Sequence, residues 1–301
     1  MLYCEAVLPR AGLGNRLFPW ARCRVFSFTN KVPMLSPRWA QLKIGPLVRG
    51  ESDPRLYFNL FKKGADEVTG TRRLRLRLFS KHETEDTPFA LPSTQNGRAT
   101  VRVFAGEQDR FLPLNGWDQF LHDELRSITN ERWLRAADRI KDVQIGIHVR
   151  MGDFAAPESD AELRLPQRRV PLKWFADSLR VIRDAVGCRI PAVLVSDGKE
   201  SELADLLKEE NVALVRTGSA IGDLLVLAKS KTLIASAGSS FGAWAAFLGQ
   251  MPSIAHPSKG FDWFNLENRN NYYVGGFDPV SPVAGFLDQV KHTFRELQTD
   301  R

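Results

Sequence analysis

The chain has 301 residues, of which 43% are hydrophobic and 26% are charged. A chain of this length can bury two hydrophobic cores of ordinary size, and the composition is that of a globular protein, not of a disordered or fibrous one. The sequence has no apolar run approaching the roughly 18 residues of a membrane span and no amino-terminal signal-peptide pattern. We therefore expect a soluble protein.

The net charge is +7, from 42 basic and 35 acidic residues. This balance favours an anionic partner, either a phosphorylated ligand or a membrane surface. The sequence contains no familiar nucleic-acid-binding motif, so we do not expect nucleic acid as the partner. Its three cysteines lack metal-ligand spacing, which predicts a cytoplasmic protein without a metal centre.

The first part of the chain has an irregular pattern. Leu2–Leu8 predicts a strand, and Gly14–Phe28 predicts a helix after a glycine-containing turn. Leucine and arginine alternate in Thr71–Phe79, which predicts a half-exposed strand with a solvated basic face. An anionic acceptor or a lipid surface is the alternative partner of that face. Ser80–Ala99 is polar with proline and glycine, which predicts a mobile loop, and Trp117–Ile140 predicts a helical bridge to a second domain.

Strands and helices alternate after residue 140. This order predicts a parallel sheet with helices on both faces, in a Rossmann-like domain. The predicted strands are Val143–Val149, Ala192–Val195, Val212–Val215 and Thr232–Ala235, and the predicted helices are Pro171–Val186, Ser201–Glu210, Ile221–Lys229 and Ser239–Leu248. A last helix is predicted to begin at Ser281-Pro282 and to bury Phe286, Leu287, Val290, Phe294 and Leu297.

Polar residues follow the strand that ends near residue 149: Ile145–Phe154 has the sequence IGIHVRMGDF. Open α/β sheets bind ligands at the carboxyl ends of their strands. His148 and Arg150 are two residues apart, so both point to the same face of a strand. A cation beside an imidazole suits a phosphate and its attached nucleoside. The alternative is a structural ion pair between Arg150 and Asp153.

Two further segments combine a strand end with a helix start. In Ala11–Ala21, Gly12 and Gly14 allow a ligand to approach the backbone, and Asn15 offers a donor and an acceptor. An ordinary turn with Asn15 as a helix cap is the alternative. Near residue 239, serine hydroxyls and backbone amides at a helix start can bind a phosphate, or the serines can simply cap the helix. Asp223 can accept hydrogen bonds from a base or ribose, or it can be a first-turn carboxylate favoured by the helix dipole.

Together these segments resemble the α-1,2-fucosyltransferases of glycosyltransferase family 11, within the wider group that includes α-1,6- and protein O-fucosyltransferases. Ala11–Ala21 is similar to the family's G-G-L-G-N-Q-L-F-Q-Y-A segment, and His148–Phe154 is similar to its H-V-R-R-G-D-Y signature. The matching segments that follow in the family's order are Ser196-Asp197, Asp223-Leu224 and Ser239–Trp244.

The resemblance implies an α/β protein of the GT-B type, with two Rossmann-like domains facing a cleft. Residues 1–140 would form the domain on the acceptor side, residues 141–275 the domain that binds the GDP-sugar, and residues 276–301 a helix that packs back on them. It also implies GDP-fucose as donor substrate, inversion at the anomeric carbon, and neither a metal nor another cofactor.

The resemblance also assigns residues to roles. Arg150 would bind the β-phosphate and stabilise the leaving diphosphate, which a guanidinium can contact through two hydrogen bonds. The other donor-binding residues would be Gly12, Gly14 and Asn15 beside the reacting sugar, His148 and Asp223 near the guanosine, and Ser239, Ser240 and the amide of Phe241 at the phosphates. Asn15 is also a candidate catalytic residue.

The sequence departs from the family pattern at several positions. Met151 stands where the signature has a second arginine, which predicts weaker donor binding, a different nucleotide sugar, or compensation by Arg16 or Arg168. Arg16 itself stands where glutamine is usual, and Gly242-Ala243 replaces a Ser-Trp pair. The candidates for a general base are Asp153 and Glu158, and each is alternatively a surface or structural carboxylate.

The sequence therefore predicts a metal-independent inverting fucosyltransferase, with an α-1,2 linkage favoured. The acceptor would be an oligosaccharide or a glycolipid, and the location would be cytoplasmic, with peripheral contact to a membrane through the basic surface. The alternatives are transfer from another nucleotide sugar and an inactive nucleotide-binding homologue. The aromatic residues in Phe261–Phe264 and Tyr272-Tyr273 either line a sugar site or pack between the domains.

Overall fold

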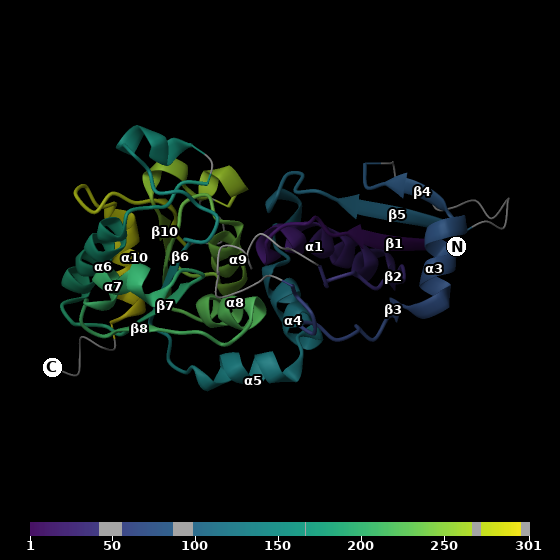
Figure 1. The fold of residues 1–301 in the computed structure, drawn as a ribbon, viewed down its shortest axis with the longest axis horizontal. Helices are drawn as coiled ribbons and strands as arrows, with labels where there is room; N and C mark the ends of the chain where they lie inside the picture. The colour runs from purple at the N-terminus through teal and green to yellow at the C-terminus, as the bar shows by residue number, and fades with distance from the viewer. Residues whose placement is uncertain (42–55, 87–98, 166, 267–271, 296–301) are drawn as a thin grey trace. The chain divides into compact units, whose positions relative to one another are not determined.

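The computed structural model describes residues 1–41, 56–86, 99–165, 167–266 and 272–295 (Figure 1). They form two compact α/β units. The first contains Met1–Gln41 and Tyr57–Asn130, and the second contains the described residues from Glu131 onward. No described helix is long and apolar enough to cross a membrane. The functional division into an acceptor side and a donor side stays a prediction.

The first unit is built on a parallel sheet with the strand order β3-β2-β1-β5-β4. Its strands are β1 (Leu2–Val7), β2 (Met34–Leu35), β3 (Glu67–Val68), β4 (Lys81–Thr84) and β5 (Thr100–Ala105), and its helices are α1 (Leu13–Asn30), α3 (Gly70–Phe79), α4 (Asp118–Ile128) and the short 3-10 helix η2 (Leu112–Leu114). The central strand β1 is buried, and the chain passes from it directly into α1, which buries Leu17, Phe18 and Trp20. The glycine turn of this unit therefore follows the central strand of its sheet.

The second unit is built on a six-stranded parallel sheet with the order β11-β10-β9-β6-β7-β8. Its strands are β6 (Ile145–Val149), β7 (Ala192–Ser196), β8 (Val212–Leu214), β9 (Thr232–Ala235), β10 (Ser253–Ala255) and β11 (Val274–Gly276). The chain starts at β6, runs outward to β8, returns to β9 beside β6, and runs outward to β11. The reversal between β6 and β9 is a topological switch point, where open α/β sheets form a ligand-binding crevice.

Helices pack on the second sheet in two layers. They are α5 (Glu131–Arg139), α6 (Leu172–Val186), α7 (Ala204–Leu207), α8 (Ala220–Ala228), α9 (Ser240–Gly249) and α10 (Ala284–Thr293), with the 3-10 helices η3 (Asp160–Arg164), η4 (Glu200–Leu203), η5 (Pro257–Lys259) and η6 (Phe261–Phe264). Helix α6 contacts α7 and α10, whereas α8 contacts α5 and α9.

The side chains of β6 alternate between these two layers. Ile145, Ile147 and Val149 lie in the core cluster that includes residues of α6 and α10. Gly146 points the other way, where a Cβ would lie 2.6 Å from the Oγ of Ser230, just after α8. His148, two residues further on, therefore faces the layer that contains α8 and α9.

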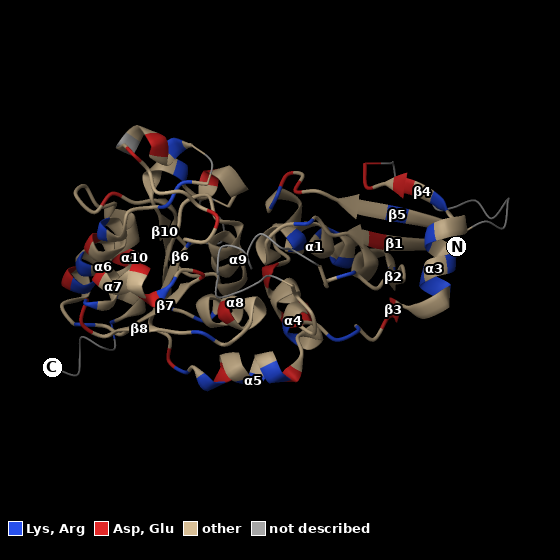
Figure 2. Cartoon of the chain, in the orientation of Figure 1, with Lys and Arg blue, Asp and Glu red and all other residues tan. Residues whose placement is uncertain are grey.

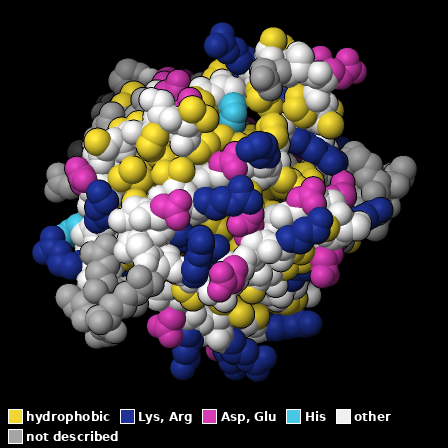
Figure 3. Space-filling view, turned by 90° about the vertical axis from the view of Figure 1, so that its left-hand side faces the viewer, with side chains coloured by type: hydrophobic (Ala, Val, Ile, Leu, Met, Phe, Trp, Pro, Cys, Tyr) yellow, Lys and Arg dark blue, Asp and Glu magenta, His cyan; other side chains and the backbone are white. Residues whose placement is uncertain are grey.

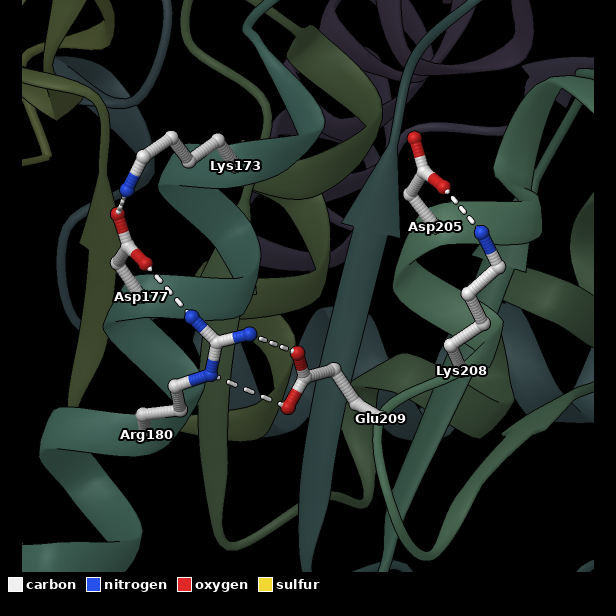
Figure 4. A network of polar contacts seen from close by, with 6 residues as sticks. All are labelled: Lys173, Asp177, Arg180, Asp205, Lys208 and Glu209. Atoms are coloured by element: carbon white, nitrogen blue, oxygen red, sulfur yellow. Dashed lines mark hydrogen bonds and ion pairs between the residues drawn. The ribbon is translucent and has the colours of Figure 1, made fainter.

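Basic and acidic residues are distributed over both units (Figure 2). On the face shown in Figure 3, side chains of opposite charge are interspersed and form no large patch of one sign. The ion pairs on α6 and α7 illustrate this mixing (Figure 4): Arg180 lies between Asp177 and Glu209, and Lys208 pairs with Asp205 at 2.8 Å. Because these pairs are solvent-exposed, they add little to stability.

The predicted strand over residues 71–79 is wrong, because these residues form helix α3. Leucine and arginine both have high helix propensity, and the segment has no β-branched residue after its first position, so the local preference is helical. The predicted loop over 80–99 is also wrong at its start, where β4 pairs with β5. Residues 87–98 of that segment lie outside the described residues.

The long helical bridge predicted over 117–140 forms two helices, α4 and α5, because Thr129 adopts an extended conformation after α4. The predicted helix over 201–210 forms η4 and the short α7. Helix α10 begins at Ala284, so the predicted cap at Ser281-Pro282 is wrong. The helix buries Phe286 and Val290 as expected, and Leu297 lies outside the described residues.

Candidate active site

The site begins where β6 and β9 end side by side at the switch point. The backbone N–H of Ser236 donates to the carbonyl of His148 at 2.9 Å, which extends the pairing of the two strands by one residue. The hydroxyl of Ser236 then accepts a hydrogen bond from the backbone N–H of Arg150 at 2.8 Å. These two contacts fix the backbone from which the Arg150 side chain projects.

Two carboxylates bind the guanidinium of Arg150. Nη1 contacts Asp197, which directly follows β7, and Nη2 contacts Asp153 in the loop after β6. Asp197 also accepts a hydrogen bond from the backbone N–H of Met151 at 2.8 Å, so its position is fixed from two sides. The ring of Phe154 lies 5.3 Å from Arg150 Cζ. The predicted ion pair with Asp153 is thus present, together with a second pair that links neighbouring strand ends.

His148, two residues before Arg150, is buried, with 4% of its area exposed. Its ring stacks on Phe241, with centroids 5.2 Å apart, and a Cβ at Gly242 would lie 3.1 Å from Nδ1. Among the described residues Nδ1 has no hydrogen-bond partner. Desolvation lowers the pKa of His148 to about 4, while Asp197 raises this pKa and Arg150 lowers it. The imidazole is therefore neutral at neutral pH, and its bare nitrogen faces the first turn of α9.

The amino-terminal end of α9 forms the next part of the site. Gly238 has φ of +65°, and Ser239 is the N-cap residue without a side-chain capping hydrogen bond. The first turn of a helix presents backbone N–H groups and a partial positive charge, which together favour an anion. The side chain of Lys259 crosses Gly238, where a Cβ would lie 3.0 Å from Lys259 Cδ. Gly238 N–H donates to the Lys259 carbonyl at 3.2 Å, so the two residues are also joined through the backbone.

The ammonium of Lys259 lies 5.2 Å above the ring of Trp263, in η6. Burial lowers the pKa of Lys259, and no described carboxylate pairs with its ammonium. Because no described carboxylate pairs with it, Lys259 is a second source of positive charge in the second unit, apart from Arg150. Its side chain lies over Gly238, just before the amino terminus of α9.

Asp223 lies in the first turn of α8, as one of its two predicted roles requires. Its Oδ1 accepts hydrogen bonds from both the backbone N–H and the hydroxyl of Thr217, each at 2.8 Å. Ser219 caps the same helix by accepting from Gly222 N–H at 3.1 Å. Asp223 thus holds the loop that precedes α8, and its contact with a nucleoside stays a prediction.

The glycine segment belongs to the first unit. Gly12 is the N-cap residue of α1, and Asn15 lies inside the helix, so the alternative prediction that Asn15 is the cap is wrong. A Cβ at Gly12 would meet nothing within 4 Å among the described residues. Gly14 is buried and Asn15 is partly buried. Packing within the first unit therefore does not by itself require a glycine at position 12.

Comparison with known proteins gives a match at the level of the fold. No protein-family model and no curated protein matches the sequence. Among solved structures, NodZ α-1,6-fucosyltransferase soaked with GDP-fucose matches with 15% identity and a TM-score of 0.51, covering 85% of this chain and 95% of that one. The same enzyme co-crystallised with GDP matches with 16% identity and a TM-score of 0.52, covering 86% and 96%. NodZ from Bradyrhizobium matches with 16% identity and a TM-score of 0.51, covering 85% and 95%.

The chain has a GT-B type fold. Its two units, each with a parallel sheet, agree with this assignment, and the match extends over nearly the whole length of the NodZ structures. The predicted fold class is confirmed.

Within this GT-B chain, Met151 lies in the hydrophobic core of the second unit. Its side chain is only 6% exposed and belongs to the core cluster with β6 and α6. A Cβ at Gly198 would lie 2.7 Å from Met151 Cγ, so the two residues are closely packed. Met151 is therefore a core residue, and the effect of a methionine at this position on donor binding stays a prediction.

The two arginines predicted to compensate for Met151 are engaged elsewhere. Arg16 is buried, and its two terminal nitrogens donate to the carbonyls of Pro9, Arg38 and Trp39 and to the side chain of Gln41. Arg168 lies 3.1 Å from Glu162. Arg16 is thus committed to the fold of the first unit, and compensation by Arg168 stays a prediction.

Two residues of the site had no assigned role in the sequence analysis. Asp197 belongs to the quoted Ser196-Asp197 pair, and its position directly after a buried strand beside β6 is a signal that could have identified it. Lys259 carries no such signal, because its proximity to Gly238 depends on how the chain after β10 folds back. Only the structure brings these distant positions together.

The remaining candidates divide between the surface and the core. Glu158 is exposed, and its carboxylate forms no ion pair with a described side chain. Phe261 and Phe264 are buried, and Tyr273 donates to the Gly276 carbonyl at 2.6 Å, so these aromatics pack within the second unit. Trp263 and Tyr272 are exposed. No group of three or more potential metal ligands occurs in the part of the chain that the structure describes.

Proposed function

We propose that the protein transfers L-fucose from GDP-fucose to a hydroxyl group of a glycan acceptor, with inversion and with an α-1,2 linkage favoured. The observation that carries this proposal is the fixed guanidinium of Arg150 at the switch point, beside the strand that leads into α9. The NodZ structures with the same fold hold GDP-fucose or GDP, which supports this donor. The family resemblance of the sequence segments supports it independently.

Arg150 would bind the diphosphate and stabilise the charge that develops on it as the sugar leaves. A guanidinium is suited to this because its donors form a planar fork that matches two phosphate oxygens. Asp197 would keep the fork oriented before the donor arrives, which reduces the entropy lost on binding. Ser239, Ser240 and the amide of Phe241 would bind the phosphates at the helix start, and Lys259 would add a second positive charge.

The guanosine would bind near His148 and Asp223. Nδ1 of His148 has no hydrogen-bond partner in the described part of the chain, which supports this, because a buried ring nitrogen without a partner is costly unless a ligand or water completes it. Gly12, Gly14 and Asn15 would border the sugar. No atom of the described residues lies within 4 Å of a Cβ built at Gly12, which supports a close approach there.

In the transfer step, the acceptor oxygen would attack C1 of fucose on the face opposite the diphosphate. The new C–O bond forms as the bond to GDP breaks, and a carboxylate takes the proton of the acceptor hydroxyl. Asp153 and Glu158 are the candidate bases. Glu158 is favoured, because Asp153 shares its charge with Arg150. The proposed reaction needs no metal, so EDTA should leave the rate unchanged.

The acceptor we propose is an oligosaccharide or a glycolipid, and the proposed location is the cytoplasm with peripheral membrane contact. Transfer from another nucleotide sugar is the competing activity. The reason for considering it is that Met151 replaces an arginine of the family signature. The burial of the Met151 side chain makes a direct contact with the donor less favourable. The other alternative is an inactive nucleotide-binding protein. Release of GDP from the donor in the presence of an acceptor would exclude it.

The test is a donor screen that measures nucleotide release with simple galactosides as acceptors. GDP-fucose should be consumed, and calorimetry should show GDP bound in preference to UDP and dTDP. Arg150→Ala should weaken GDP binding by about 10²-fold, because it removes a charged contact. Arg180→Ala is the matched control, since Arg180 is also held by two carboxylates but lies on α6 (Figure 4). Preference for another nucleotide, or equal effects of the two variants, would overturn the proposal.

A further inference from the structure

Helix α3 of the first unit exposes two of its three leucines and turns Arg73 and Arg77 inward. Leu74 is 50% exposed, Leu78 is 63% exposed and Phe79 is 65% exposed. These positions are four and five residues apart and share one side of the helix. A helix on the surface of a soluble protein ordinarily exposes its charges and buries its apolar stripe.

The inward side explains how the helix is held in this orientation. Arg73 and Arg77 both bind Oε1 of Glu5, at 3.2 Å and 3.1 Å, and Glu5 is a buried residue of β1. Arg73 also donates to the Ser36 carbonyl at 2.8 Å. Leu76 packs in the core of the first unit. The buried carboxylate thus fixes α3 with its other leucines facing solvent.

The outward side combines apolar and basic residues. Arg75 is exposed between Leu74 and Leu78, and the helix contains no acidic residue (Figure 2). Arg72 donates to the Tyr3 hydroxyl at 3.0 Å, and this hydroxyl donates to the sulfur of Met1 at 3.0 Å. Met1 is itself largely exposed.

We propose that the outward face of α3, formed by Leu74, Arg75, Leu78 and Phe79, docks on an anionic lipid surface. Leucine and phenylalanine side chains insert at the boundary between headgroups and acyl chains, and arginines bind lipid phosphates. The lipid surface fits better than a second copy of the chain, because a twofold contact through this face would bring Arg75 against its own counterpart. It also fits better than a folded partner, because one short helix provides less area than a specific protein interface needs.

The experiment is co-sedimentation of the full chain with vesicles of dioleoylphosphatidylcholine, with or without dioleoylphosphatidylglycerol. The protein should bind the anionic vesicles preferentially, and binding should weaken as salt is added. The double variant Leu74→Ser/Leu78→Ser should lose about tenfold or more of this binding. Leu112→Ser/Val280→Ser is the matched control, since Leu112 and Val280 are also exposed but lie outside α3. Arg75→Gln should bind more weakly and with less salt dependence.

Several outcomes would overturn the proposal: no binding of the wild type to anionic vesicles, equal loss in the α3 variant and the control, or self-association that the α3 variant abolishes. Circular dichroism and thermal unfolding show whether each variant is folded. GDP binding measured on the same variants should be unchanged. This readout separates a failure of the lipid surface from a failure of the proposed donor site, because neither result depends on the other.

Discussion

Asp197 binds the side chain of Arg150 and, through its other oxygen, the backbone N–H of the next residue. One carboxylate at the end of β7 therefore fixes both the position of the backbone after β6 and the orientation of the Arg150 guanidinium. The contact joins neighbouring strands of the sheet, so the orientation of Arg150 is a product of the sheet and not of its own loop alone.

Replacing Asp197 with asparagine should lower turnover about tenfold while the protein stays folded. The amide can still accept from the Met151 N–H but no longer pairs its charge with Arg150, so the guanidinium loses orientation. Initial rates of GDP release measure the effect. Asp177→Asn is the control: Asp177 pairs with Arg180 on α6, outside the proposed site, so its loss should leave turnover unchanged. An equal loss of turnover in the two variants would contradict the role of Asp197.

Stability should fall between neutral pH and pH 4, with His148 as a main cause. Its pKa is about 4 in the folded protein and near 6.5 when unfolded, so the unfolded chain binds the extra proton between these values. Stability is therefore retained above pH 6.5 and declines as the pH falls toward 4, by about 3 kcal/mol if the full difference applies. Urea unfolding at pH 7 and pH 4.5 measures this loss.

The variant His148→Gln should show a smaller loss of stability over the same pH interval, because glutamine does not titrate. His292→Gln is the control, since His292 is exposed at the end of α10. The same pH dependence in the wild type and in both variants would contradict the assignment to His148.

Lys259→Met should weaken GDP binding about tenfold and leave guanosine binding unchanged, because the ammonium would contact only the phosphates. The methionine keeps the apolar part of the side chain over Gly238 and removes the charge. Lys231→Met, at an exposed position before β9, is the matched control and should bind GDP normally. Calorimetry with GDP and guanosine distinguishes the outcomes. An equal loss for both ligands would mean that Lys259 supports the fold and does not contact phosphate.

The sequence predicted β6 to β9 of the second unit, and β1 and α1 of the first, to within a few residues, but it did not predict β10, β11 or α3. Apolar runs such as Thr232–Ala235 and the stripe of Leu172–Val186 are long enough for their periodicity to decide the element. In α3 the alternation of Leu74, Arg75 and Leu76 imitates a strand, and only the burial of Leu76 and the pairing of Arg73 with Glu5 settle the helix. Periodicity cannot identify a helix whose apolar residues face outward.

Positions near strand ends could be predicted from the sequence, whereas contacts between residues distant in the chain could not, and the roles of the site residues stay predictions. His148 lies near the end of β6, and Arg150 and Ser239 follow β6 and β9, so the pairing of these two strands alone brings the loops after them together. The inward side chain of Met151 and the path of Lys259 over Gly238 depend on backbone direction in loops, which sequence patterns do not specify.

Gly238→Ala should destabilise the protein more than Gly187→Ala, although both glycines have positive φ, +65° and +78°. Each alanine carries the strain of the left-handed conformation, about 1–2 kcal/mol. At Gly187, which ends α6, a Cβ meets nothing within 4 Å in the described structure, so strain is the whole cost. At Gly238 the Cβ also displaces Lys259.

Urea unfolding of both variants, and of Gly238→Ala combined with Lys259→Ala, measures this second contribution. The double variant should recover part of the loss, and equal stabilities for the two glycine variants would show that Lys259 does not press on Gly238.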